Sequence, residues 1–263
     1  MDSQAQSIWG GQGEATVRLF LRWWIVIAVP VVLTMGVVRL TTMSWYPRWE
    51  YQRSGFPADP FEMPTEERLR LAQASIRFLN RPTTLEALEV LELPDGTPAY
   101  NDRELSHMAD VKRVYDQLTA VAGFFLVAAV VAGWALVRRG RASLVWAAIS
   151  DGGLLTLGLL VALAIWMALG FEAFFTAFHG VFFSGDSWLF SYSDTLIRLF
   201  PLPFWQHAGL LIAGTVSITA LVLALFGRAM QKRLDRAAAS SAAVPQYRSR
   251  PPWAVADVWI APA

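Results

Sequence analysis

Three stretches of the chain, each about as long as a membrane-spanning helix, contain no charged side chain. They are residues 117–137, 152–171 and 208–227. A fourth apolar stretch, residues 19–38, is interrupted only by Arg22 and contains Pro30. A helix of about 20 residues crosses the hydrocarbon core of a bilayer, and lipid-buried helices tolerate a proline where neighbours satisfy the freed backbone groups. The sequence therefore predicts an all-α integral membrane protein with four transmembrane helices.

Basic residues in the short connections predict how these helices are oriented. Arg138, Arg139 and Arg141 lie between the second and third helices, and a second basic group follows the fourth. Membrane proteins keep such Lys and Arg residues on the cytoplasmic side, so both termini are predicted to be cytoplasmic. The second basic group is Arg228, Lys232, Arg233 and Arg236.

The predicted helices divide the chain into spans and connections. The spans are residues 19–42, 117–137, 144–171 and 208–228, the cytoplasmic segments are residues 1–18, 138–143 and 229–263, and the extracytoplasmic segments are residues 43–116 and 172–207. We expect residues 1–16 to be loose. The tail after Leu234, which is Ala/Ser-rich and then Pro/Arg-rich, has the composition of a disordered segment.

Composition excludes several classes of function. The chain has no cysteine, which removes a disulfide framework, a zinc–thiolate site and a cysteine nucleophile. Its formal net charge is only +1, and its basic residues follow the topology, so nothing indicates binding to nucleic acid. The sequence contains no GxSxG, HExxH, P-loop or GxGxxG motif and implies no cofactor.

The first extracytoplasmic segment is predicted to contain local helices and one tight turn. A helix is expected to begin at Thr65 after Pro64, and residues 94–96 (Pro-Asp-Gly) indicate a β-turn. From Asp102 the chain is predicted to be helical and to continue into the second span.

A dense group of titratable residues lies at the start of that helix. Glu104, His107 and Asp110 recur every three residues, which places them near one helical face, and Lys112 follows. A carboxylate beside an imidazole fixes its tautomer and raises its basicity, as a general base requires. The spacing is equally typical of a solvated helix end with ordinary ion pairs, and both interpretations stay open at this point.

The second extracytoplasmic segment contains the aromatic tract FEAFFTAFHGVFF, residues 171–183. Helical spacing places its phenylalanines on one broad face and Glu172, Thr176 and His179 on a narrower polar stripe. Such a segment is expected to be amphipathic, lying in the headgroup layer or partly re-entrant. A lone histidine in an apolar tract is more often structural than catalytic, and Glu172 is its natural partner.

A functional role is better supported for His107 and His179 together than for either alone, because both fall on the same predicted side of the membrane. Ionisable groups at that depth are costly and often functional. His207, at the mouth of the fourth helix, is on the same side but is more typical of an interfacial anchor. A metal site is not predicted, because the Glu-x-x-His pattern of di-iron bundles needs a second copy and this chain has one.

Asp151 lies near the cytoplasmic end of the third helix. It is expected to be structural, either capping that helix or pairing with Arg22 or Arg138.

The two histidine tracts together resemble a family of bacterial membrane proteins, the lipoprotein intramolecular transacylases. The resemblance rests on ELSHMADVK before the second helix and on FHGVFFSGDSWLF followed by SDTLIRLFP after the third. It spans roughly residues 20–230 and includes the four-helix plan. One departure is Gly185, where the family often has asparagine.

The resemblance implies an acyltransferase in the bacterial cytoplasmic membrane, with its site on the extracytoplasmic face. Such enzymes move the sn-2 acyl chain of a diacylglyceryl lipoprotein to the α-amine of its N-terminal cysteine. The motif histidines, His107 and His179, are the expected catalytic pair, supported by Glu104, Asp110 and Glu172, with Lys112 or a backbone N–H stabilising the oxyanion. Aromatic residues would line the acyl-chain groove, although packing between helices explains them equally well: Phe178, Phe182, Phe183 and Trp188.

The expected partners are therefore membrane lipid and a lipid-modified lipoprotein. A non-enzymatic role as a structural subunit of a larger membrane complex is the alternative, with protein partners bound through the C-terminal tail.

Overall fold

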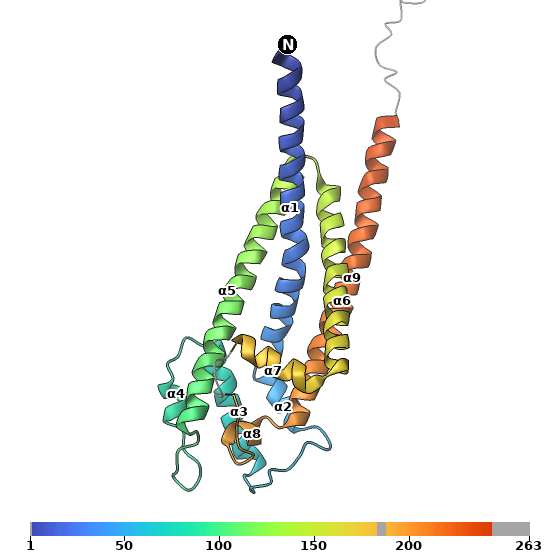
Figure 1. Ribbon diagram of the computed structural model, residues 1–263. Coiled ribbons are helices and arrows are strands. Elements are labelled where there is room, and N and C mark those ends of the chain that lie inside the picture. Colours follow the sequence, from blue (N-terminus) through green and yellow to red (C-terminus); the bar gives the residue numbers. More distant parts are fainter. Residues whose placement is uncertain (1, 183–187, 244–263) are drawn as a thin grey trace, which may run out of the picture.

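The computed structural model describes residues 2–182 and 188–243, and within them the regular elements are helices (Figure 1). In chain order they are α1 (Asp2–Thr41), α2 (Trp45–Tyr51), α3 (Thr65–Asn80), α4 (Glu86–Glu89), α5 (Asp102–Arg138), α6 (Ala142–Leu169), α7 (Phe171–Phe182), α8 (Thr195–Leu199) and α9 (Leu202–Ala243). Four of them, α1, α5, α6 and α9, are long and apolar enough to cross a membrane, which confirms the predicted four-helix membrane protein.

The four long helices run side by side, and the short helices gather at one end of them (Figure 1). We call that end the cap, which comprises α2, α3, α4, α8 and the loops that join them. The N-terminus and the end of α9 lie at the opposite end, beside the α5–α6 connection. At 1.5 Å per residue α5 is about 55 Å long, nearly twice the thickness of a hydrocarbon core, so its first turns extend beyond the membrane into the cap.

The chain is helical further toward both termini than the sequence led us to expect. The helix α1 begins at Asp2, so the expectation of a loose segment over residues 1–16 was wrong where the structure describes it. At the other end α9 continues to Ala243, whereas we expected disorder after Leu234. Extending an existing helix adds one hydrogen bond per residue without a new nucleation step, and the Ala/Lys/Arg-rich composition after residue 228 favours it. Residues 244–263 lie outside the described part of the chain.

Small residues allow α6 to lie close to both α1 and α9. A Cβ atom on Gly152 would come within 2.6 Å of the Val29 side chain, and one on Gly153 within 2.5 Å of the Ala220 carbonyl oxygen. The Ser150 hydroxyl donates a hydrogen bond of 2.9 Å to the Ala224 carbonyl. In lipid the hydrophobic effect does not drive helices together, so they associate through close backbone packing of this kind.

An ion pair joins α1 and α6 inside the membrane-spanning bundle. The guanidinium of Arg22 donates a hydrogen bond to the carboxylate of Asp151. Of the roles considered for Asp151, the structure therefore shows pairing with Arg22. A charge that lies within a membrane bundle is normally paired in this way.

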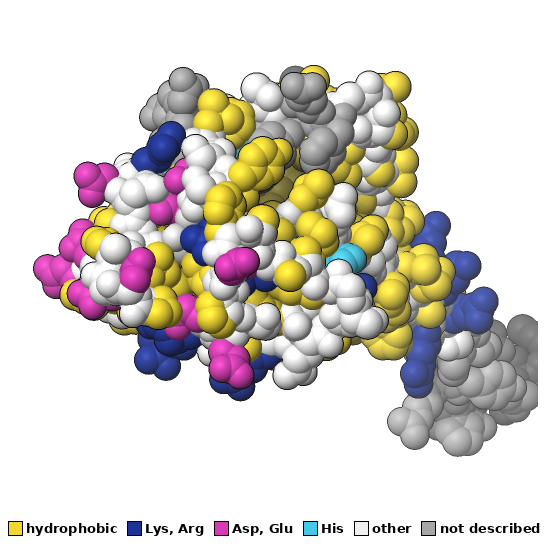
Figure 2. Space-filling model, turned by 90° about the horizontal axis from the view of Figure 1, so that it is seen from below, with side chains coloured by type: hydrophobic (Ala, Val, Ile, Leu, Met, Phe, Trp, Pro, Cys, Tyr) yellow, Lys and Arg dark blue, Asp and Glu magenta, His cyan; other side chains and the backbone are white. Residues whose placement is uncertain are grey.

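The cap has its own hydrophobic core, which is tied to the start of α9. The predicted helix start at Thr65 and continuous helix from Asp102 are confirmed, as is the turn, in which Gly96 adopts φ +83°. The hydroxyls of Tyr46 and Tyr51 donate to the carbonyls of Phe204 and Leu199 at 2.9 and 2.7 Å. Figure 2 looks onto the cap, where acidic and basic side chains gather on one part of the face and hydrophobic side chains reach the surface over the rest.

Arg68 supports the cap from within, because only 2 % of it is exposed. Its guanidinium donates to the carbonyls of Arg198 and Pro57 at 2.6–3.0 Å and lies over the rings of Tyr51 and Phe56. These contacts join α3 to α8 and to the loop before α3.

The bundle is open on the cap side between α5 and α6. The contacts shown between these helices lie near their connecting loop, where Ala132 and Leu136 pack with Ala148. From residue 157 to residue 169 no residue of α6 is buried. The helix α7 follows directly and lies across the bundle at this level (Figure 1). On the side of α5, this half of α6 is therefore accessible to lipid or to a lipid-like molecule.

Candidate active site

A capping box fixes the helical turn on which His107 lies. The side chain of Asn101 accepts a hydrogen bond from the Glu104 amide at 3.0 Å, and the Glu104 carboxylate accepts one from the Asn101 amide at 2.9 Å. The residues that allow this are an asparagine at the N-cap and a glutamate three positions later. His107 lies one turn further along α5, ten residues before the predicted span.

His107 is half-buried and is held in its neutral form. Its ring contacts the edge of Phe190, with ring centroids 5.1 Å apart at 75°. The pKa of His107 is lowered from 6.5 to about 4, chiefly by burial and also by the proximity of His179, while Asp110 acts in the opposite direction. The imidazole is therefore uncharged at neutral pH and can accept a proton.

His179 lies on α7, close enough to His107 for its charge to act on that ring. Its ring packs against Trp188, with centroids 4.8 Å apart and the planes inclined by 31°. Because the charge of His179 affects His107, the structure brings the two motif histidines together from helices 72 residues apart in the chain. Together with Phe190 and Trp188 they form what we call the histidine site.

Phe190 was not among the residues that the sequence singled out. Trp188 was, and the two alternate along a non-helical segment in which the intervening Leu189 is 48 % exposed. Alternation of two inward-facing aromatics directly after a helix is a pattern that could have identified Phe190.

The three acidic or basic neighbours of His107 have different partners. Both oxygens of Glu104 accept backbone hydrogen bonds, from Asn101 and, at 2.7 Å, from Leu196 of α8. Asp110 forms an ion pair of 3.0 Å with Arg113 while acting on His107 through its charge. Asp110 is thus the carboxylate whose charge acts on this imidazole.

Lys112 faces α3 rather than the histidine site. Its ammonium donates to the carbonyl of Arg81 at 3.0 Å, pairs with Asp116 at 3.2 Å and lies 5.5 Å from the centre of the Phe78 ring. These contacts hold α5 against α3, and we assign no charge-stabilising role to Lys112 in the reaction.

The remaining residues expected at the site belong to α7 and the segment after it. Glu172 and Phe178 lie on α7, but their side chains are outside those that the structure describes, and Phe183 is outside the described residues altogether. Phe182 is half-buried at the end of α7.

His207 belongs to a different cluster. Its Nδ1 atom lies 2.5 Å from a carboxylate oxygen of Glu50, a fully buried residue that also pairs with Arg53 at 3.3 Å. This cluster joins α2 to α9, in keeping with a structural role for His207.

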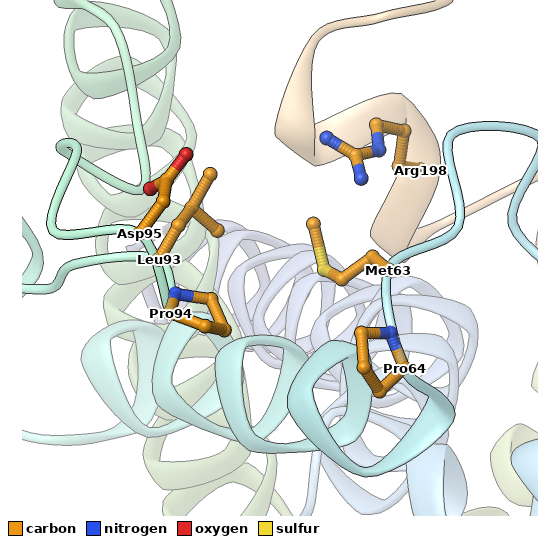
Figure 3. A pocket seen from close by; sticks show the side chains of 6 residues that line it. All are labelled: Met63, Pro64, Leu93, Pro94, Asp95 and Arg198. Carbon is orange, nitrogen blue, oxygen red and sulfur yellow. The ribbon is translucent and has the colours of Figure 1, made fainter.

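Among the described residues, the histidines do not belong to a metal-binding group, and they do not line the cavity found in the cap. Among the described residues no group of three His, Asp or Glu side chains is placed to hold a metal ion. A cavity of about 210 Å³ lies between the start of α3, the turn at residues 93–95 and α8 (Figure 3), and none of the residues that line it is a histidine. The histidine site therefore lies outside this cavity.

These features define a four-helix integral membrane protein with a pair of histidines at the junction of bundle and cap. A model of the lipoprotein intramolecular transacylase (Lit) family matches residues 23–205, and the chain belongs to this family. The matched region includes both histidines of the site.

Known proteins support the assignment. The chain is 33% identical over 226 residues to an uncharacterized protein of Aquifex aeolicus (strain VF5), which covers 82% of this chain and 97% of that one. The fold of the present chain is similar to that of the Lit protein of Bacillus cereus, with a TM-score of 0.63 at 21% identity over 88% of this chain and 99% of the Bacillus chain. A variant of the Bacillus protein with a histidine-to-alanine substitution gives a TM-score of 0.61 at 21% identity, over 87% of this chain and 98% of that one.

Proposed function

We propose that this protein transfers an acyl chain within a diacylglyceryl lipoprotein, from the sn-2 position of the glycerol to the α-amine of the N-terminal cysteine. The observation that carries the proposal is the proximity of two family-motif histidines, close enough for the charge of His179 to lower the pKa of His107, at the level where the bundle opens to lipid. The reaction takes place on the extracytoplasmic face of the bacterial cytoplasmic membrane, in keeping with the basic residues at the opposite end.

The open half of α6 suits a lipid substrate. None of its residues from 157 to 169 is buried, and the side chains of α5 opposite are apolar. Acyl chains of the substrate can remain among these side chains while the ester and the amine reach the histidine site. The acyl chains then never leave an apolar environment, which would cost about 0.8 kcal/mol for each CH₂ exposed to water.

Proton transfer is the chemistry that the histidine site supplies. The amine nitrogen attacks the ester carbonyl carbon, and His107 accepts the proton that the nitrogen loses. The bond between that carbon and the glycerol oxygen then breaks, and an imidazolium returns the proton to this oxygen, so the reaction needs no net proton. A low pKa suits both steps of His107, since the ring is neutral at the start and its protonated form readily gives the proton up.

Packing against the aromatic side chains contributes orientation. Phe190 and Trp188 pack against the rings of His107 and His179 and so restrict the rotation of both imidazoles. Restricting the catalytic groups in this way lowers the entropy that the reaction must lose. Asp110 favours the protonated form of His107 as it develops.

Replacing either histidine tests the proposal. We expect His107→Ala and His179→Ala to reduce formation of the lyso-form lipoprotein by at least about 10²-fold, the usual contribution of general acid–base catalysis. The reaction is followed by mass spectrometry of the N-terminal lipopeptide of a reporter lipoprotein, in a host that makes diacylated lipoproteins.

The third histidine provides a matched control. In His207→Asn the amide nitrogen can replace Nδ1 as the partner of Glu50, so this variant is expected to remain within a few-fold of the unsubstituted protein. Unchanged lyso-form in both alanine variants would contradict the proposal. The alternative of a non-enzymatic subunit is not favoured by the family to which the chain belongs.

A further inference from the structure

A buried carboxylate connects the helix of His107 to the segment that follows α7. Glu104 is 1 % exposed and lies on α5, one turn before His107. Its second oxygen accepts the hydrogen bond of the Leu196 amide, in the first turn of α8, at 2.7 Å. The two residues are 92 positions apart in the chain. A single side chain thus joins the helix of His107 to the segment that contains Phe190 and Trp188.

A second contact fixes the same segment to the same helix end. The carboxylate of Asp194 accepts a hydrogen bond from the side chain of Asn101 at 3.2 Å and one from the Ser191 amide at 2.8 Å. The guanidinium of Arg103 lies 3.9 Å from this carboxylate and donates to the carbonyl of Leu189 at 3.5 Å. These contacts curl residues 191–194 and hold residue 189 beside α5.

The geometry of the segment explains why these anchors matter to the histidines. Counting back from Leu196, which Glu104 holds, Phe190 is six residues away and lies against His107. Trp188 is two residues further and lies against His179. Trp188 and Phe190 belong to a segment without helix or strand, so no regular backbone ladder fixes their position.

We propose that Glu104, with Asp194, is a positioning residue. The two side chains hold residues 188–196 against the start of α5 and so place Phe190 and Trp188 against the two histidines. We call this pair of anchors the latch. This inference rests on the proposed function. It assigns to Glu104 a role in holding the segment, through two backbone N–H groups, and the orientation of His107 follows from the position of Phe190.

The variant Glu104→Gln tests the latch with little change of shape. The two oxygens of Glu104 each accept a backbone N–H. A glutamine has one oxygen and one NH₂ group, so it can satisfy one of these donors and must oppose the other. We expect kcat for lyso-form formation to fall about 10-fold or more through misorientation of the site, with KM for the lipoprotein within about 3-fold.

Imidazole resonances provide a readout that does not depend on activity. The chain has three histidines, so a spectrum of histidine-labelled protein in detergent contains three sets of ring signals, assigned by substituting each histidine. The ring of Phe190 shifts the signals of His107, and release of the segment removes that shift. We expect Glu104→Gln to move the signals of His107 and His179 and to leave those of His207 in place.

Glu50→Gln is the matched control. Glu50 is also fully buried in the cap, but its partners are His207 and Arg53. This variant is expected to lose similar thermal stability, to shift only the signals of His207 and to keep kcat. Equal effects of both variants on kcat, or unchanged His107 signals in Glu104→Gln, would overturn the latch. An unsubstituted protein that forms no lyso-form would instead reject the proposed function, and the resonances would still test the latch.

Discussion

The imidazole of His107 is surrounded by groups that disfavour its charged form. Burial against Phe190 removes water, and His179 adds a second potential positive charge nearby. Asp110 is the neighbour that acts in the other direction. The balance leaves a neutral ring that gains a proton only when the reaction supplies one, which is the state that a proton shuttle needs at its start.

The lowered pKa of His107 predicts how stability depends on pH. Because the folded protein binds this proton with a pKa of about 4 and an unfolded chain with 6.5, folding is favoured above pH 6.5 and this contribution is lost as the pH falls toward 4. In His107→Asn, which cannot gain the charge, the melting temperature is expected to fall less between pH 6.5 and 4 than in the unsubstituted protein. Thermal unfolding in detergent over this pH range measures the difference, and parallel pH profiles of the two proteins would contradict it.

Several of these residues could be found in the sequence, but their partners could not. The spacing of Glu104, His107 and Asp110 placed them on one helical face, and the motif drew attention to His179. The partner of the Glu104 carboxylate is a backbone amide 92 residues away, and the sequence carries no signal for such a bond. The partner of Lys112 could not be predicted either, because its contact with Arg81 depends on where α3 packs.

At the scale of the elements, α6 is the helix on which the bundle depends. Its first half is inserted between α1 and α9 through Gly152 and Gly153, and none of the residues in its second half, from 157 to 169, is buried. A closely packed half and a more exposed half therefore belong to one continuous helix. Because the helix is continuous, the packing of its first half also fixes the direction of its second half.

Gly153 and Gly158 provide a matched test of this arrangement on one helix. A Cβ at Gly153 would meet the Ala220 carbonyl oxygen at 2.5 Å, whereas a Cβ at Gly158 has nothing within 4 Å. Gly153→Ala is expected to destabilise the protein by about 1–3 kcal/mol, as overpacking does. Gly158→Ala should be neutral or stabilise it by up to about 1 kcal/mol. The melting temperatures of the two variants in detergent decide this, and an equal effect of both would show that the helices separate easily.

The long helices and α3 could be predicted because their signals are local. Charge-free stretches predicted the spans, and the proline before Thr65 marked the start of α3. The place of α7 depends on tertiary contacts, for example the edge contact of Trp166 with Phe174, whose ring centroids are 5.2 Å apart. Helical periodicity indicated its amphipathic character, but the meeting of His179 with His107 followed only once α7 had been placed across the bundle.

For the whole molecule, the distribution of charge and the position of the histidine site predict one orientation. We therefore expect the cap and the site on the extracytoplasmic side, and the N-terminus, the α5–α6 connection and the end of α9 in the cytoplasm (Figure 1). A lipoprotein substrate carries its modified cysteine on the outer surface, so the proposed function requires this orientation.

The absence of cysteine from the sequence makes the orientation simple to test. Val90 of the cap is 73 % exposed, and Ser240, near the end of α9, is also exposed. A membrane-impermeant maleimide should label Val90→Cys in intact spheroplasts and should label Ser240→Cys only after lysis. The unsubstituted chain, which has no thiol, is the blank. The reverse labelling pattern would invert the topology and contradict the proposed function.

The ion pair between Arg22 and Asp151 also constrains how the protein is made. The two residues are 129 positions apart, and a ribosome adds about 5–20 residues per second, so Arg22 emerges roughly 6–26 s before Asp151. During that interval the first helix carries an arginine whose counter-charge has not been synthesised. Until α6 is made, this charge therefore depends on water or lipid headgroups in place of the Asp151 carboxylate. The order of translation thus leaves the charge of Arg22 without its partner until the third span has been made.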